Sequence, residues 1–154
     1  MPDDRAGAGT LLGFDYGTRR IGVAVGQPLT GTASPLAAVV ARDGAPDWDA
    51  VTRLIEEWRP SAIVVGIPYN MDGSRQEMTD RAERFQRQLH GRFHLPVHAV
   101  DERLSSHEAE DRLRAARQEG RRGRIAKPEI DSAAACVLLE TWLAHQGDHE
   151  KAPD

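Results

Sequence analysis

Apolar positions in the first forty residues fall into three short runs separated by turn-forming residues. Residues 11–15 and 20–26 form the first two runs, and only four residues lie between them. The third run, residues 36–40, follows a segment rich in turn formers, residues 27–35. Connections this short join antiparallel strands. The first part of the chain therefore predicts a three-stranded antiparallel meander.

Beyond these strands, the pattern alternates between apolar residues at helical spacing and short apolar runs. Residues 62–67 are apolar without interruption, which is typical of a strand covered on both faces. A Ser or Thr followed three residues later by Glu indicates a capping box at a helix start. The expected elements are a helix over 47–58, a strand over 62–67, a helix opened by Ser74 and Glu77, a strand over 96–102, a helix opened by Ser105 and Glu108, and an apolar helix over 130–145.

Strands that are joined through helices lie parallel in one sheet, with right-handed crossovers. The sequence therefore predicts an α/β fold with a five-stranded mixed sheet, three strands antiparallel and then two parallel, flanked by helices. A single domain is expected over residues 10–146. Residues 1–9 and 147–154 are polar, and we expect them to be flexible. The tryptophans at helical core spacing are expected to pack in the core rather than stack on bases; they are Trp48, Trp58 and Trp142.

Acidic residues stand where apolar segments end or begin. Asp15 closes the first strand, Asp101 and Glu102 close the fifth, and Asp131 opens the last helix. The carboxyl ends of strands in an open α/β sheet converge on one crevice, so we expect these side chains to meet there. Grouped carboxylates repel one another unless a cation neutralises them. All-oxygen ligands favour Mg²⁺ or Mn²⁺.

Two of these acids have alternative interpretations. Asp131 is also a favoured helix N-cap residue, and that role alone would explain it. Neighbouring residues in a regular strand point to opposite faces, so only one of Asp101 and Glu102 would face the crevice. The polar residues of the loop over 66–74 are equally open, because they would either position a substrate or form a turn and a helix cap. These residues are Asn70, Asp72 and Ser74.

Composition narrows the class of protein. The chain has 154 residues and a net charge of −4, which excludes a uniformly basic nucleic-acid coat but leaves room for a local basic patch. Its one cysteine, Cys136, excludes an intramolecular disulfide and suits a buried side chain. No apolar stretch is long enough to span a membrane, and the first residues lack the apolar core of a signal peptide. We therefore expect a cytoplasmic protein with no membrane partner.

Positive charge gathers just before Asp131. The basic residues of this segment that are best placed to hold phosphates are Arg121, Arg122, Arg124 and Lys127. Arg19 and Arg20 follow Asp15 closely and are second candidates for the same role. Earlier arginines, over residues 112–117, would either contact phosphates or form a solvated helix face. Binding through such contacts weakens steeply with salt.

Four segments carry a resemblance to a known family: GFDYGTRRIGVAVG, IVVGIPYNMDGS, VDERLSSHEAE and IDSAAACVLLE. In order and spacing they resemble the YqgF family, also called RuvX, which is described as a family of pre-16S rRNA nucleases or Holliday junction resolvases. The resemblance covers residues 10–143. It implies a ribonuclease H-like fold and the catalytic, metal-binding acids Asp15, Glu102 and Asp131. The segment Lys127-Pro128-Glu129-Ile130-Asp131 departs from the family's Lys-Gly-Lys-Val-Asp, because Glu129 replaces a lysine.

The resemblance implies a nuclease that hydrolyses phosphodiester bonds with two Mg²⁺ or Mn²⁺ ions, in maturation of the 5′ end of 16S rRNA. One alternative is a nuclease that cuts branched DNA at four-way junctions, which would require a two-fold dimer. The sequence leaves monomer and homodimer open. A second alternative is a non-catalytic protein that binds nucleic acid or a transcription factor. A third comes from DYGT, residues 15–18, which resembles the phosphate loop of actin-like ATPases, but those need two such domains.

Overall fold

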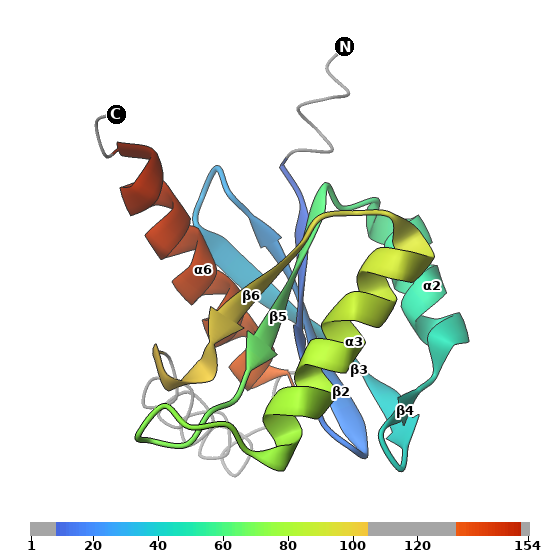
Figure 1. The fold of residues 1–154 in the computed structure, drawn as a ribbon. Helices are drawn as coiled ribbons and strands as arrows, with labels where there is room; N and C mark the ends of the chain where they lie inside the picture. The colour runs from blue at the N-terminus through green and yellow to red at the C-terminus, as the bar shows by residue number, and fades with distance from the viewer. Residues whose placement is uncertain (1–8, 105–131, 152–154) are drawn as a thin grey trace, which may run out of the picture.

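The computed structural model describes residues 9–104 and 132–151, and within the last helix it describes side chains as far as residue 146. One sheet of six strands forms the centre, in the order β4-β3-β2-β1-β5-β6 (Figure 1). The strands are β1 Leu11–Asp15, β2 Arg20–Gln27, β3 Thr32–Arg42, β4 Ala45–Pro46, β5 Ala62–Ile67 and β6 Val97–Asp101. The helices are α2 Trp48–Trp58, α3 Glu77–Phe93, the 3₁₀ helix η1 Glu102–Leu104 and α6 Ala133–Lys151.

The strand pairing confirms the predicted mixed sheet. β1, β2 and β3 form the antiparallel meander, and β5 and β6 lie parallel to β1. Two details differ from the prediction. β3 already begins at Thr32, inside the segment expected to be a turn, and the two-residue β4 adds a sixth strand. Asp43 and Gly44 turn the chain between β3 and β4 with positive φ angles of 51° and 85°.

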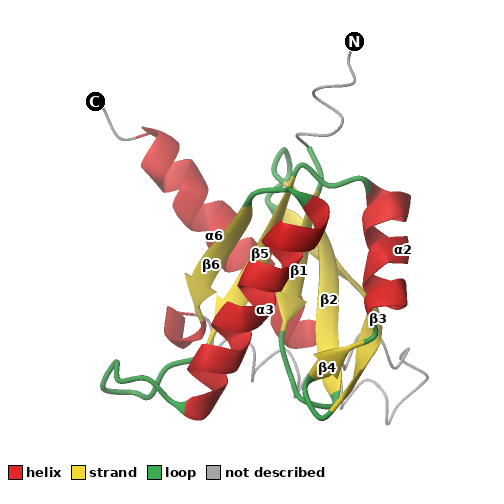
Figure 2. Cartoon of the chain, turned by 45° about the vertical axis from the view of Figure 1, so that its right-hand side comes forward, coloured by secondary structure: helices red, strands yellow, loops and turns green. Residues whose placement is uncertain are grey.

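Helices cover both faces of the sheet (Figure 2). On one face, α2 and α3 bury Leu12 and Phe14 of β1, and the ring of Phe14 meets that of Phe85 edge-on at 5.6 Å. On the other face, α6 packs against Leu11 of β1 and Val64 of β5. Coverage on both faces explains why all six residues of β5 are apolar or glycine and buried. Cys136 lies buried in α6, as expected.

The start of α3 corrects the predicted capping box. The helix begins at Glu77 with Gln76 as its N-cap, and the reciprocal side-chain bonds join Gln76 and Thr79. Ser74 donates its hydroxyl to Asp72 instead, within the preceding turn. The prediction was wrong because the carboxylate two residues earlier captures the serine. The Ser105–Glu108 box lies outside the described residues.

The last helix is longer than predicted, since it continues to Lys151. Its described side chains include the apolar run that covers the sheet, with Leu138, Leu139 and Leu143 buried. Despite this run, none of the helices in the described residues combines the length and the hydropathy that a membrane crossing needs.

Candidate active site

Asp15 and Glu102 meet at the carboxyl end of the sheet although their strands are not neighbours. Asp15 ends β1, Glu102 follows β6 at the start of η1, and β5 lies between the two strands. The side chains nevertheless share a hydrogen bond. Because residues 11, 13 and 15 point to one face of β1, this carboxyl pair lies on the side of the sheet that α6 covers.

Gly66 of β5 makes this meeting possible. It stands opposite Val100 in the pairing of β5 with β6, and Val65, just before it, stands opposite Phe14 of β1. A Cβ at Gly66 would lie 3.1 Å from both Cγ and Oε2 of Glu102. Glu102 therefore extends across the space that any other residue at this position would fill, and reaches Asp15.

Burial raises the pKa values of both carboxyl groups, and the negative charge of Asp15 raises that of Glu102 further. Burial raises the pKa of Asp15, and its hydrogen bond with Glu102 opposes that rise. The pKa of Glu102 is raised to about 8 by burial, by the negative charge of Asp15 and by their hydrogen bond. At neutral pH the protonated Glu102 carboxyl thus donates to the Asp15 carboxylate, and the two groups titrate as a unit.

Asp101 takes no part in this pair, because Arg103 binds it. Nη2 of Arg103 lies 2.7 Å from Oδ2 of Asp101, and Nε lies 3.1 Å from both carboxylate oxygens. The backbone N–H of Arg103 donates to Oδ1 at 2.9 Å. These bonds lower the pKa of Asp101. Of the two neighbouring acids, Glu102 is therefore the one beside Asp15.

Arg103 also fastens the loop that follows β5. Its guanidinium lies 5.6 Å from the centre of the Tyr69 ring, and Nη1 lies 3.5 Å from the carbonyl oxygen of Met71. Both contacts join η1 to the segment of residues 69–74. A single arginine thus connects the residue after Glu102 with the loop at the end of the neighbouring strand.

The three polar residues singled out in this loop bond mainly to one another. Nδ2 of Asn70 donates to the Ser74 hydroxyl at 3.0 Å. The backbone N–H and the hydroxyl of Ser74 donate to Asp72 at 2.9 and 2.6 Å, and both bonds lower the pKa of Asp72. The turn alone accounts for these bonds, and all three residues are exposed.

Ser132 anchors the start of α6, and sequence reasoning missed it. Its buried hydroxyl accepts from the backbone N–H of Val23 at 2.9 Å and donates to the carbonyl of Leu36 at 2.7 Å. These contacts join the residue directly after Asp131 to β2 and β3. The available signal was a small hydroxyl residue placed between an acid and a long apolar run.

The remaining candidates divide into exposed residues and residues that are not described. Arg19 and Arg20 are exposed where the chain turns from β1 into β2. The candidates outside the described residues are Asp131, Arg121, Arg122, Arg124 and Lys127. In the part of the chain that is described, no three His, Cys, Asp or Glu side chains are grouped in a way that could hold a metal. The structure therefore brings together two of the three predicted acids.

Comparison with known proteins identifies the family. The family profile described as "RuvX: Holliday junction resolvase" matches residues 9–145. The chain belongs to the RuvX family. A RuvX relative from Azotobacter vinelandii, named "Putative pre-16S rRNA nuclease", is 55% identical over 142 residues, which are 92% of this chain and 97% of the relative. One from Escherichia coli O157:H7, with the same name, is 50% identical over 136 residues, or 88% and 96% of the two chains.

Solved structures of low sequence identity share the fold. T. thermophilus RuvC in complex with a Holliday junction substrate aligns with a TM-score of 0.52 and 18% identity, over 90% of this chain and 96% of that chain. The fowlpox virus resolvase, in complex with Holliday junction DNA, aligns with a TM-score of 0.56 and 12% identity, over 89% and 98%. RuvX membership confirms the predicted family and the assignment to phosphodiester-cleaving nucleases. The alignments confirm the predicted α/β fold class.

Proposed function

We propose that this RuvX chain is a metal-dependent endonuclease that matures the 5′ end of pre-16S rRNA in the cytoplasm. The observation that carries the proposal is the partly buried pair of Asp15 and Glu102, whose side chains share a hydrogen bond and whose pKa values are raised. Two partly buried carboxyls this close together are costly for a fold. They suit a site that exchanges the shared proton for a cation. The names of the relatives at 50–55% identity supply the RNA substrate.

The donor set fits Mg²⁺ or Mn²⁺, because Asp15 and Glu102 offer only oxygen and become fully charged once the proton leaves. Asp131 would be the third ligand, and it directly precedes Ser132, which is bonded to β2 and β3. When bound, a pair of such ions activates water and stabilises the leaving 3′ oxygen. Asp15 holds its ligand position from the end of a paired strand. Glu102 gives up its proton and reaches in over Gly66.

The basic residues would hold the substrate's phosphates. Arg19, on the turn that follows Asp15, and Arg20, at the start of β2, are both exposed and close in sequence to the proposed cleavage site. We assign the same role to the basic cluster before Asp131, which comprises Arg121, Arg122, Arg124 and Lys127. The loop of Asn70, Asp72 and Ser74 would position the strand through its fixed shape, since its own hydrogen bonds hold that shape.

Cleavage of four-way DNA junctions is the second candidate function, and the family description favours it. Symmetric cleavage of a junction requires two active sites related by a two-fold axis. A junction resolvase would therefore be a stable homodimer, whereas trimming of an RNA end requires only one copy. The oligomeric state of the purified protein separates the two functions before any substrate is added.

A cleavage assay tests the proposal. Labelled precursor rRNA and a synthetic four-way junction are incubated with the protein in Mg²⁺ or in EDTA. We expect cleavage of the RNA in Mg²⁺ alone, and none by Asp15→Asn or Glu102→Gln. Asp49→Asn, which changes an exposed acid in the first turn of α2, serves as the matched control and should cleave normally. If the protein cuts the junction in preference to the RNA, junction cleavage is the function and the RNA proposal is wrong. Full activity of Asp15→Asn would refute both proposed functions.

A further inference from the structure

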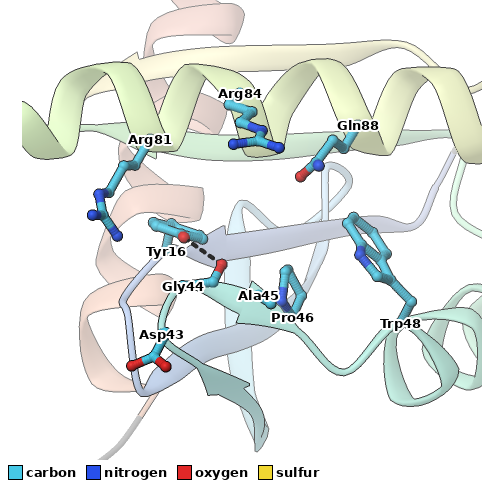
Figure 3. Close-up of a pocket in the computed structure, with 9 residues that line it drawn as sticks. All are labelled: Tyr16, Asp43, Gly44, Ala45, Pro46, Trp48, Arg81, Arg84 and Gln88. Atoms are coloured by element: carbon cyan, nitrogen blue, oxygen red, sulfur yellow. Dashed lines mark hydrogen bonds between the residues drawn. The ribbon is translucent and has the colours of Figure 1, made fainter.

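A pocket lies on the opposite face of the sheet from the carboxyl pair. It is a pocket of about 360 Å³ between α3 and the turn that joins β3 to β4 (Figure 3). Its volume falls within the range of small-ligand pockets, about 300–1,000 Å³. The side chains that shape it are Tyr16, Pro46, Trp48, Arg81, Arg84 and Gln88.

Tyr16 links this pocket to the end of β1. It follows Asp15 directly but points to the other face, where its ring packs against Phe85 with 5.2 Å between ring centres. Its hydroxyl donates to the carbonyl of Gly44 at 2.5 Å. A Cβ at Gly44 would lie only 2.8 Å from this hydroxyl and 3.0 Å from Nη1 of Arg81. Glycine therefore keeps this end of the pocket open.

The charge of the pocket suits an anion. Arg84 reaches from α3 toward the floor, as Figure 3 shows, and makes no ion pair or hydrogen bond with the described residues. Arg81 pairs with the exposed Glu77 at 3.2 Å, one helical turn earlier. Asp43, at the far end, contributes the single carboxylate among the lining residues. Guanidinium groups bind phosphate through paired, charge-assisted hydrogen bonds.

The other end of the pocket suits a planar base. Trp48 and Pro46 form an apolar wall, and Gln88 lies above them with its amide directed into the pocket. Trp48 itself is held in place, since the guanidinium of Arg92 lies 4.0 Å from its ring centre and Phe85 lies on the core side. An amide can both donate to and accept from the edge of a base. The pocket thus presents, from one end to the other, an apolar wall, an amide and a guanidinium that has no partner in the described part of the chain.

We propose that this pocket binds a nucleoside monophosphate unit. The base lies against Trp48 and Pro46 beside Gln88, and the phosphate binds Arg84 and Arg81. The unit is supplied either as a free nucleotide or as an unpaired nucleotide of a nucleic-acid strand. The site is separate from the proposed cleavage site, because Tyr16 and Asp15 point to opposite faces of the sheet.

Calorimetric titration in EDTA tests this proposal without any cleavage. The ligands are AMP, adenosine and a short single-stranded oligoadenylate. The variants are Arg84→Ala and, as matched control, Arg87→Ala, which removes an exposed arginine one turn away on the same helix. We expect Arg84→Ala to weaken AMP or oligoadenylate binding by about tenfold or more, the loss of one charge-assisted contact. Arg87→Ala should change binding less than twofold, and adenosine should bind more weakly than AMP.

The ligand arms distinguish the two sources of the nucleotide. Binding of AMP that depends on Arg84 supports a free nucleotide, and Arg84-dependent binding of the oligomer alone supports a bound strand. A shift of the Trp48 indole N–H resonance, with that of Trp58 unchanged, would place either ligand in the pocket. Failure of both to bind at about 1 mM, or equal losses in the two arginine variants, would overturn the proposal. Neither result depends on nuclease activity, because no divalent metal is present.

Discussion

The space left by the missing side chain of Gly66, through which Glu102 reaches Asp15, should be as important for activity as the two acids themselves. In Gly66→Ala, the new methyl group would lie 2.5 Å from Cδ1 of Leu138 and 3.1 Å from Cγ and Oε2 of Glu102. Overpacking of this kind costs about 1–3 kcal/mol of stability, and the lower chain entropy of alanine offsets about 0.5–1 kcal/mol. We expect a net loss of about 1–2 kcal/mol in urea denaturation.

The effect on cleavage should be larger than the effect on stability. A methyl group beside Oε2 moves Glu102 away from Asp15, and a displacement of about 1 Å in a reacting group can lower a rate by about 10²-fold. The assay is the single-turnover cleavage rate in saturating Mg²⁺, measured at a temperature where the variant is fully folded. Circular dichroism establishes that temperature.

Two further variants separate the two effects. Gly91→Ala in α3 is the control, because its Cβ meets no atom within 4 Å; it should be slightly stabilising and fully active. Adding Leu138→Val to Gly66→Ala removes the closest clash, so stability should partly recover while the cleavage rate stays low. A Gly66→Ala protein with the wild-type rate and metal affinity would show that Glu102 does not need this space.

Three other changes test the site by different measurements. The pKa of Glu102 is about 8, against an ordinary 4.5, so the folded state keeps a proton that the unfolded state loses. Melting temperatures in EDTA should therefore fall as pH rises through that interval, and Glu102→Gln should remove most of the fall; an unchanged pH profile would contradict the shared proton. Arg103→Ala frees Asp101 and the loop, and should lower metal affinity or cleavage about 10–100-fold, while stability changes by less than about 1 kcal/mol. Ser132→Ala leaves one N–H and one carbonyl of the sheet unpaired, and should cost about 1–3 kcal/mol for each in urea denaturation; a cost below about 0.5 kcal/mol would refute the anchoring role.

Short connections and uninterrupted apolar runs were enough to predict the sheet, because each of these patterns allows few arrangements. Asp15 was likewise predictable as the end of a buried strand. Strand alternation alone did not identify its partner, because the strand ends at Asp101 and η1 begins at Glu102; the family resemblance is what implied Glu102. The structure adds the physical reason, which is that Arg103 binds Asp101.

The features that sequence reasoning missed depend on contacts between distant segments. In the sequence, Gly66 is an ordinary small residue in an apolar strand. Only the structure shows that the side chain of Glu102 passes over it. Trp48 was expected in the core, and it does pack there, but one part of it also lines the pocket. β4 was not predicted, because a strand of two residues is too short to show an alternating pattern of apolar and polar positions. Ser74 followed the sequence pattern of a helix cap, but its hydroxyl donates to the carboxylate of Asp72, two residues earlier, instead of capping the helix.

The bonds of Ser132 have a consequence for the timing of assembly during translation. The serine stands near the end of the chain, whereas both of its partners belong to strands that leave the ribosome early. Because both bonds need β2 and β3 to be in place, the start of α6 docks only onto a meander that has already formed. Docking of this end of α6 onto the sheet is therefore a late step when the chain folds during its synthesis.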